Sequence, residues 1–329
     1  MPSRLRVFAP ATVANLGPGF DILGLALETP GDVVEGELTA TAGVEIAGIT
    51  GDGGALSTDP ERNVVGRAAA DVLRRAAGAA RGRGLRLWLH KQMPLASGLG
   101  SSGASSVAAA VVANELLGRP FARADLLASA MEGERAASGS AHADNVAPGL
   151  LGGIVLVRSY EPLELVSLPV PTGLWMAVAH PHCELPTSTA REVVKAHRYA
   201  IAEVVANLGN VGALVSALHA GDLALLGRSI EDVLVEPLRA PLIPAFAEVK
   251  AAALGAGGLG CSIAGAGPSV FALAGDEAAA RRAGAAMCET FAASARIACD
   301  LYVGQVSRSG ARVLQPDEGV GAAAAGSGR

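Results

Sequence analysis

Apolar and polar residues alternate in several short stretches of the chain, and each such stretch predicts a β-strand. Pro10 and Pro94 are expected to end the first two strands, because proline cannot donate a hydrogen bond to a sheet ladder. The predicted strands are residues 4–10, residues 85–93, residues 174–180 and the ends of the segments 138–158 and 255–273.

Alanine-rich segments with helical spacing lie between these strands and predict helices. Gly118 is expected to close one of them, and Gly209 and Gly221 are expected to interrupt the longest. The segment 138–153 is rich in small polar residues and is expected to form a loop before its strand. The predicted helices cover residues 63–77, residues 104–118, residues 124–137, most of residues 187–230, and a segment that runs to about Leu254.

The predicted strands and helices follow one another along the chain in an irregular order. A chain of 329 residues is long enough for two domains, and a proline-rich, irregular stretch near residues 160–171 predicts the boundary. We therefore expect one domain over residues 1–165, a second over residues 166–314, and a disordered tail over residues 315–329.

Composition narrows the range of partners. The formal net charge of −5 leaves no basic field for nucleic acid, so nucleic acid is not expected to bind. We find no uninterrupted apolar run of the ~20 residues that span a bilayer, so no membrane association is expected. The four cysteines form no C-x-x-C pair, which favours reduced thiols in a cytoplasmic protein.

The stretch PLASGLGSSGAS carries the spacing G-x-G-x-x-G at Gly98, Gly100 and Gly103. A dinucleotide site would need an acidic residue at the end of a second strand about 20 residues later, and Asp125 instead begins a predicted helix. A Walker loop would need lysine after its last glycine, and none is there. A phosphate held at the start of the following helix is the remaining ligand, beside the plain alternative of a tight turn that caps this helix.

Three segments together resemble the motifs of the GHMP small-molecule kinases, the family of galactokinase, homoserine kinase, mevalonate kinase and phosphomevalonate kinase. They are PATVANLGPGFDILGLAL, PLASGLGSSGASSVAAAVVANELLG and SIAGAGPSVFAL, in family order and spacing. The segments ANLGPGFD, SGSAHADNVAPGLLGG, TSTAREV and EPLRAPLIPAF resemble the homoserine kinase members in particular. The resemblance implies an α+β fold with an N-terminal ribosomal-protein-like domain that carries the nucleotide, a C-terminal ferredoxin-like domain, and an active site between them.

The resemblance also implies ATP, Mg²⁺ and transfer of the γ-phosphoryl group to the hydroxyl of L-homoserine, in a homodimer. Ser102 and Glu134 match the metal positions, with Glu132 as a competing choice and an exposed helix face as the structural alternative for Glu134. Asn63 matches the adenine and ribose pocket, although it could equally cap a helix. The expected ATP loop consists of Pro94, Leu95, Ala96, Ser97, Gly98, Leu99, Gly100, Ser101, Ser102, Gly103 and Ala104.

The same resemblance assigns substrate-binding residues on both halves of the chain. Arg191 and Arg239 match carboxylate-binding positions, and forked guanidinium groups suit a carboxylate, although either arginine could be a surface residue. Asn15 and Asp21 match residues that meet the polar head of the substrate, and an anionic Asp21 would complement its ammonium group. Asn15 could instead form hydrogen bonds only within its own turn. The full expected set is Asn15, Asp21, His142, Asn145, Thr187, Arg191, Arg239 and Gly265.

Three residues are expected to act near the reacting atoms: Asn145, Asp144 and Glu134. Many GHMP kinases place an aspartate base at the position of Asn145, so the resemblance implies direct attack by the hydroxyl without a strong base. Asp144 remains an alternative base. Other readings of the chain are a GHMP kinase for a different small alcohol, a catalytically silent GHMP-like sensor, and, more remotely, a dehydrogenase.

Overall fold

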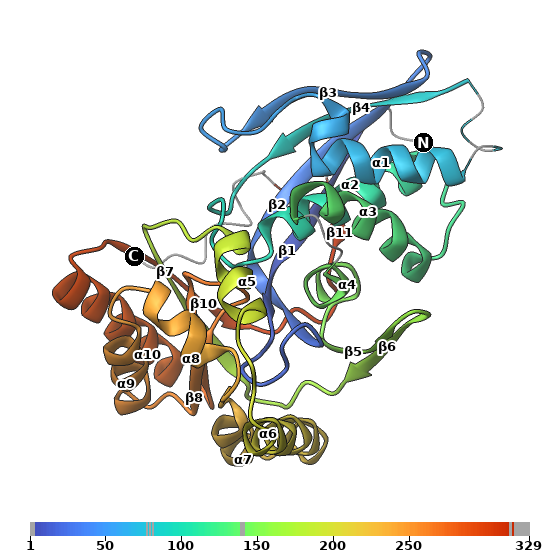
Figure 1. Ribbon diagram of the computed structural model, residues 1–329. Helices are drawn as coiled ribbons and strands as arrows, with labels where there is room; N and C mark the ends of the chain where they lie inside the picture. The colour runs from blue at the N-terminus through green and yellow to red at the C-terminus, as the bar shows by residue number, and fades with distance from the viewer. Residues whose placement is uncertain are drawn as a thin grey trace.

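The computed structural model of the protein describes residues 4–76, 78, 80, 82–138, 142–315 and 318. Helices and strands alternate irregularly along the chain and build two separate sheets, seen in Figure 1 as a larger unit that holds the N-terminus and a smaller unit beside it. The prediction of an α+β fold is confirmed.

The larger sheet has the strand order β11-β1-β2-β4-β3, and β5 pairs with both β2 and β6. Its pairs are antiparallel except for the parallel pair β3 and β4. The strands are β1 (Arg4–Ala14), β2 (Leu23–Thr39), β3 (Gly43–Thr50), β4 (Gly84–His90), β5 (Ile154–Tyr160), β6 (Leu163–Leu168) and β11 (Arg312–Val313).

The smaller sheet is antiparallel, with the order β10-β7-β9-β8. A bridge between Leu27 of β2 and Val306, just after β10, joins the two units at their edges. The strands are β7 (Trp175–Pro181), β8 (Gly260–Ile263), β9 (Val270–Ala274) and β10 (Cys299–Gln305).

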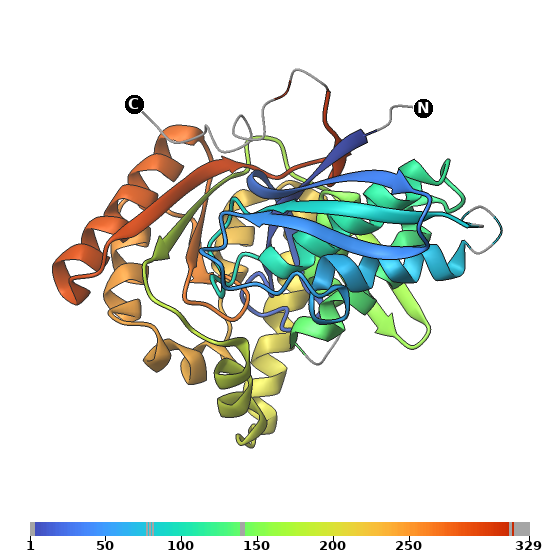
Figure 2. The ribbon, with the colours of Figure 1, turned by 90° about the horizontal axis from the view of Figure 1, so that it is seen from above.

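Helices cover the sheets, and Figure 2 shows the two units side by side. In the larger unit, α2 packs on β1 and β2 with α1 and α3 beside it, while α9 and α10 pack on the smaller sheet. The helices are α1 (Val64–Arg75), α2 (Ser101–Leu116), α3 (Leu126–Ser138), α4 (Ala143–Leu151), α5 (Thr187–Lys195), α6 (Ile201–Ala220), α7 (Leu223–Ser229), α8 (Glu236–Arg239), α9 (Phe246–Gly255) and α10 (Glu277–Thr290).

One hydrophobic cluster runs through both units, and a second lies within the smaller unit. Leu25 and Val107 from the larger unit and Met176 from the smaller belong to a single buried cluster. Alanines at positions 108–110 of α2 are fully buried, and such small side chains let this helix lie close to the sheet. The core therefore holds α2, and with it the glycine loop at its start, in a defined place.

Two expected boundaries are wrong. The first strand does not end at Pro10 but continues to Ala14, because a register shift between Pro10 and Thr12 removes the need for a proline N–H in the ladder. The long helical stretch is not interrupted at Gly209, which lies inside α6. A Cβ at Gly209 would meet nothing within 4 Å, so this glycine is a surface position and not a break.

The expected loop at 138–153 is also corrected, because it contains α4. Residues 139–141 of that segment lie outside the described residues. Val146 and Leu150 of α4 are fully buried, and this packing stabilises a helix that contains Pro148. A Cβ at Gly24 of β2 would lie 1.8 Å from the carbonyl oxygen of Asp144, so Gly24 allows α4 to approach the sheet.

Among the described residues, α6 is one helix that is long and apolar enough to cross a membrane by length and composition, which is weak evidence by itself. Polar residues such as Glu203, Asn207 and Asn210 interrupt this helix, so it does not contradict the expectation that no uninterrupted apolar run of that length exists. The domain limits 1–165 and 166–314 remain predictions; β6 extends across the expected limit, to Leu168. The predicted tail lies outside the described residues except for positions 315 and 318.

Candidate active site

A cavity of about 520 Å³ gathers residues from both units of the molecule. Its volume lies in the usual range for a small-molecule site. The sequence-predicted residues that line it are Asn15, Asp21, Asn63, Leu95, Ala96, Ser97, Gly98, Gly100, Ser101, Ser102, Glu134, His142, Asp144, Asn145, Thr187, Arg191, Arg239 and Gly265. The structure therefore brings together residues that are up to 250 positions apart, such as Asn15 and Gly265.

The glycine loop forms one wall of the cavity and leads into α2. Gly98 and Gly100 have φ angles of 79° and 64°, in the region that favours glycine. No side chain of the described residues caps the start of α2, so its first N–H groups remain available to an anion. Together with the positive end of the helix dipole, they form an anion-binding arrangement.

Gly103 differs from the other two glycines of the G-x-G-x-x-G pattern. A Cβ at Gly103 would meet its nearest neighbours at 3.6 Å, which is ordinary van der Waals contact. A Cβ at Gly98 would lie 2.4 Å from the carbonyl oxygen of Ala264. The fold therefore requires glycine at positions 98 and 100 but not at position 103. In a dinucleotide site the third glycine is needed for close packing of the helix on the strand, so Gly103 does not have that role.

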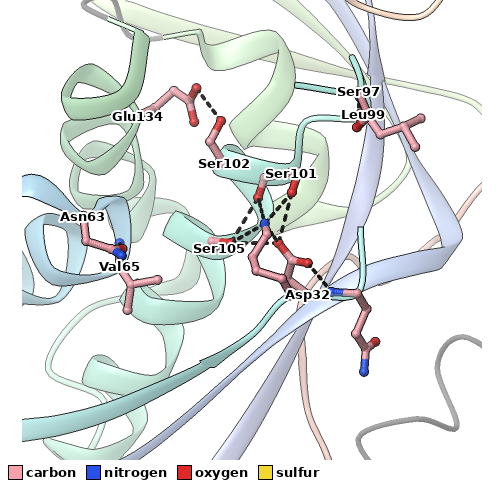
Figure 3. A network of polar contacts seen from close by, with 11 residues as sticks. Asp32, Asn63, Val65, Ser97, Leu99, Ser101, Ser102, Ser105 and Glu134 are labelled. Carbon is pink, nitrogen blue, oxygen red and sulfur yellow. Dashed lines mark hydrogen bonds and ion pairs between the residues drawn. The ribbon is translucent and has the colours of Figure 1, made fainter. Parts of the chain in front are cut away.

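Lys91, which the sequence analysis missed, lies directly below the loop and lines the cavity. Its ammonium group donates to the Asp32 carboxylate, to the Ser101 hydroxyl and, at 3.1 Å, to the Ser105 hydroxyl. Figure 3 shows Asp32, Ser101 and Ser105 converging on this point. The side chains of Lys91 and Asp32 are 2% and 0% exposed, so a paired positive charge is buried under the start of α2.

The only sequence signal for Lys91 was its place just before PLASGLGSS. A search for a Walker lysine looks after the last glycine, whereas this lysine follows β4 on the other side of the loop. Only the folded chain places its ammonium group beside Ser101.

Ser102 and Glu134 form a pair at the edge of the cavity, visible in Figure 3. The Ser102 hydroxyl donates to Glu134 Oε1 at 2.9 Å. Glu134 is 6% exposed, and its burial raises the pKa of the carboxyl group despite the Ser102 hydrogen bond. Glu132 points elsewhere and forms an ion pair with Arg67 at 2.7 Å. The structure thus places Glu134, and not Glu132, in the cavity.

Asn63 lines the cavity and also caps α1. Its Oδ1 accepts a hydrogen bond from the N–H of Val65 at 2.9 Å, and its Nδ2 donates to the carbonyl of Ser57 at 2.7 Å. The Asn63 side chain therefore caps the helix as expected, and the residue also lines the cavity.

The two arginines meet over the aromatic ring of Phe20. The guanidinium carbon of Arg239 lies 5.1 Å from the ring centroid and that of Arg191 lies 5.8 Å away. Arg239 is 3% exposed and donates to the carbonyls of Ala190 and Gly265, and burial lowers its pKa. Two guanidinium groups in one partly dry pocket are suited to bind a carboxylate.

Asn15 and Gly265 connect the loops that carry these groups. Asn15 Nδ2 donates to the carbonyl of Gly265 at 2.8 Å, and its Oδ1 accepts from the N–H of Asp21 at 3.0 Å. Both ends of the amide are thus engaged by the protein. A Cβ at Gly265 would lie 2.9 Å from the carbonyl oxygen of Gly98, so this glycine lets the loops of the two units touch.

Arg191 donates to both Asp21 Oδ1 and His142 Nδ1, each at 2.9 Å. A guanidinium group has no acceptor, so His142 Nδ1 must accept and the ring proton must be on Nε2. Burial and the charge of Arg191 lower the pKa of His142, in agreement with a neutral ring. His142 therefore orients Arg191 and does not carry charge itself.

Asp144 is 1% exposed, and its Oδ1 has no hydrogen-bond partner among the described residues. Burial, and then the charge of Asp21, raise the pKa of Asp144 to about 7. Ligand atoms of Asp21, His142 and Asp144 lie within 4.8 Å of one another. An unsatisfied buried acceptor beside a second carboxylate is an arrangement that attracts a cationic group.

Asn145 lies beside the glycine loop and directly follows Asp144 in α4. Its Oδ1 accepts from the Thr12 hydroxyl at 3.4 Å, and a Cβ on Gly100 would lie 3.0 Å from that same oxygen. Thr187 is exposed at the start of α5 on the opposite wall. Asn145 is thus a cavity-lining side chain close to the glycine loop.

Four predicted loop residues are not among the described residues that line the cavity: Pro94, Leu99, Gly103 and Ala104. Leu99 is fully buried, and its carbonyl accepts from the N–H of Thr12 at 3.0 Å. Leu99 thus supports the loop from behind, whereas a side chain at Gly103 would lie next to Asn145 and Glu134.

Comparisons with known proteins agree with this architecture. The family model "GHMP kinases N terminal domain" matches residues 63–153, and "GHMP kinases C terminal" matches residues 214–293. The chain therefore belongs to the GHMP kinase family, and the predicted family architecture is confirmed.

Individual relatives place the chain more narrowly. The homoserine kinase of Chlorobium phaeovibrioides is 49% identical over 94% of this chain and 99% of its own length. The homoserine kinase of Chloroherpeton thalassium is 47% identical over 93% and 98%. The crystal structure of homoserine kinase from Cytophaga hutchinsonii is 50% identical and superposes with a TM-score of 0.91 over 95% of this chain and 98% of that one. Within the GHMP family, the chain groups with the homoserine kinases.

Proposed function

We propose that the protein transfers the γ-phosphoryl group of ATP to the side-chain hydroxyl of L-homoserine and releases O-phospho-L-homoserine, a step of threonine biosynthesis. The observation that carries this proposal is one cavity with an anion-binding helix start on one wall and two guanidinium groups on another. Relatives that are named homoserine kinases over nearly the whole chain support the choice of alcohol.

The acceptor end is proposed to hold the amino-acid head of homoserine. Arg191 and Arg239 bind its carboxylate, because their guanidinium groups face the same pocket and stay charged. Asp21 and the unsatisfied Oδ1 of Asp144 bind its ammonium group. Thr187 stands beside Arg191 on the same helix and completes this wall.

The donor end is proposed to hold the phosphates of ATP, with Asn63 near the nucleoside. The N–H groups of residues 98–102 and the ammonium of Lys91 counter the charge that spreads over the transferred group. Phosphoryl transfer requires positioning and charge neutralisation more than covalent chemistry, and this wall supplies both.

No strong base is proposed at the reacting hydroxyl. The side chain of Asn145 accepts or donates a hydrogen bond there, and it orients the hydroxyl for in-line attack on the γ-phosphate. The hydroxyl proton then passes to a phosphate oxygen as the bond to the leaving group breaks. Asp144 is assigned to the ammonium because its carboxylate lies in the cluster with Asp21 and His142.

We propose a Mg²⁺ site at Ser102 and Glu134, because a hydroxyl and a carboxylate oxygen 2.9 Å apart are hard donors of the kind Mg²⁺ prefers. When bound, the ion would neutralise phosphate charge. Glu134→Gln should sharply weaken the Mg²⁺ dependence of nucleotide binding, measured by calorimetry, while Glu132→Gln serves as the matched control. Equal Mg²⁺ dependence in both variants would remove Glu134 from the site.

The oligomeric state and compartment are part of the same proposal. The resemblance favours a homodimer, and α6 presents Ile201, Val205 and Leu208 at 78%, 62% and 63% exposure, a face that a second copy would bury. Sedimentation of Val205→Glu should yield monomers, and an unchanged sedimentation coefficient would remove α6 from the interface. We place the enzyme in the cytoplasm, without nucleic acid or membrane partners.

The decisive experiment is a substrate panel with Mg²⁺ and ATP. The purified protein is incubated with L-homoserine, L-serine, mevalonate and shikimate, and both ADP and the phosphorylated product are followed. ADP release that depends on L-homoserine, with O-phospho-L-homoserine as product, would establish the proposal. Turnover of a different alcohol would agree with the proposed phosphate-binding loop but would contradict carboxylate binding of homoserine by Arg191 and Arg239. ATP binding without turnover of any alcohol would favour a catalytically silent sensor.

A further inference from the structure

A second cluster of reactive side chains lies in the smaller unit, on α10 and β10. Cys288 is on α10, and Cys299 begins β10 at the edge of the smaller sheet. Their Sγ atoms are 2.9 Å apart, and both residues are partly exposed. Neither cysteine is among the described residues that line the active-site cavity.

We propose that Cys288 and Cys299 form a redox-active dithiol, a modification site at which a small-molecule disulfide such as oxidised glutathione forms a reversible intramolecular disulfide. The geometry of the two sulfur atoms carries this inference. It is independent of the proposed kinase function.

The connection between the two cysteines holds them in place. Residues 291–295 form a π-helical turn, and Phe291 at its start is fully buried. The N–H of Ile297 donates to the carbonyl of Phe291 at 3.2 Å, which closes the turn. On the far side, Cys299 pairs with Pro181 across the sheet. Both sulfur atoms are therefore positioned by regular structure and need little movement to bond.

The hydrogen bond between the two thiols also makes them chemically unequal. The contact between the two sulfur atoms lowers the pKa of Cys288 and raises that of Cys299. The thiolate is the attacking species in disulfide exchange, so Cys288 is the expected nucleophile and Cys299 the resolving thiol. Cys261, by contrast, is buried with its pKa raised to about 12, so it should not react.

The reaction balances without a further partner. The Cys288 thiolate attacks one sulfur of oxidised glutathione, forms a mixed disulfide and expels one glutathione thiolate. Cys299 then gives up its proton, attacks the Cys288 sulfur and expels the second glutathione. Two protein thiols are thus oxidised while one glutathione disulfide is reduced to two glutathione molecules. In a reducing cytoplasm, the bond would be transient and reversible.

The expected consequence is mechanical, because the bond would fasten the end of α10 to the edge strand β10. Figure 2 shows α10 at the outer side of the smaller unit, and β10 runs from this side toward the larger unit. Closing this short loop should raise the unfolding temperature of the oxidised protein. Catalytic turnover should change by less than about two-fold, because the loop that the disulfide closes contains none of the described residues that line the cavity.

The test treats the reduced full-length protein with oxidised glutathione, blocks the remaining thiols with an alkylating reagent, and identifies cysteine-linked peptides by mass spectrometry. We expect two of the four thiols to escape alkylation. One peptide pair should link residues 288 and 299, and dithiothreitol should reverse the change. Cys183→Ser is the matched control and should behave like the unaltered protein.

Two variants separate the roles of the cysteines. Cys299→Ser should accumulate a glutathione adduct on Cys288, because the resolving thiol is missing, whereas Cys288→Ser should react slowly or not at all. Full alkylation of all four cysteines after oxidation would overturn the proposal. A bond from Cys299 to Cys183, or a bond between two chains, would overturn it equally, and so would an unfolding temperature that oxidation leaves unchanged.

Discussion

Replacing the glycines of the G-x-G-x-x-G pattern one at a time separates a kinase phosphate loop from a dinucleotide fingerprint. Gly103 lies inside α2, and a Cβ there would meet only contacts at 3.6 Å or more. Gly103→Ala should therefore cost no packing energy and should stabilise the helix by roughly 0.5–1 kcal/mol, since alanine restricts the unfolded chain more than glycine does. The kinase rate should stay within about two-fold of the unaltered protein.

Gly98→Ala is the matched variant with the opposite expectation. A Cβ at Gly98 would lie 2.4 Å from the Ala264 carbonyl oxygen and 2.7 Å from that of Gly267, both backbone atoms that cannot move aside cheaply. The positive φ of 79° adds about 1–2 kcal/mol of backbone strain for alanine. The loop must shift, so we expect ATP affinity to fall at least about ten-fold, which corresponds to 1.4 kcal/mol.

The assay combines calorimetric titration with ATP and thermal unfolding of both variants. A weaker effect of Gly98→Ala than of Gly103→Ala on ATP affinity would refute the reasoning. So would a large loss of ATP affinity in Gly103→Ala, because it would mean that the third glycine approaches the ligand as it does in a dinucleotide site.

Three further predictions concern the buried charges. The pKa of Asp144 is about 7 in the ligand-free enzyme, and a bound ammonium group favours the carboxylate form. Homoserine binding at pH 7 should therefore release roughly half a proton, and homoserine affinity should weaken as the pH falls. Calorimetry in buffers of different ionisation enthalpy measures this release, and Asp144→Asn should show none. Asp32→Asn leaves the Lys91 charge buried without its partner, so the free energy of unfolding should fall by about 3–5 kcal/mol and the unfolding temperature by roughly 4–7 °C. Glu45→Gln removes one partner of an exposed ion pair and should cost less than about 1 kcal/mol. Equal shifts in the two variants would contradict the burial argument. Arg239→Lys keeps the positive charge but removes the forked guanidinium group, so KM for homoserine should rise about ten-fold while KM for ATP stays unchanged. A change in KM for ATP alone would place Arg239 at the nucleotide instead of the homoserine carboxylate.

Much of the candidate site could be predicted because its chemistry lies in continuous motifs. Gly98, Gly100 and Ser102 follow one another in the loop, and Arg191 and Arg239 each stand in a recognisable segment. Local sequence also distinguished the loop from a dinucleotide site, since the acidic residue that such a site needs begins a helix. Each of these inferences depends on neighbours within a few dozen residues.

The errors came from packing that local sequence does not reveal. Helix α4 contains a proline and two glycines within or beside it, yet burial of Val146 and Leu150 against the larger sheet stabilises it. Gly209 was expected to break a helix, but its exposed position in α6 costs only the small helix propensity of one glycine. In both cases tertiary context outweighed local preference.

The sequence by itself determined the α+β class, the family, the phosphate loop and the residue types for an amino-acid substrate, because these depend on short-range patterns. Only the tertiary structure decided which groups meet. It put the Lys91 ammonium under the loop, chose Glu134 over Glu132, set Asp144 beside Asp21 with its raised pKa, and brought Cys288 against Cys299. The physical reason is that distance, burial and electrostatic coupling belong to the folded chain, and residues far apart in sequence acquire them only when the core packs.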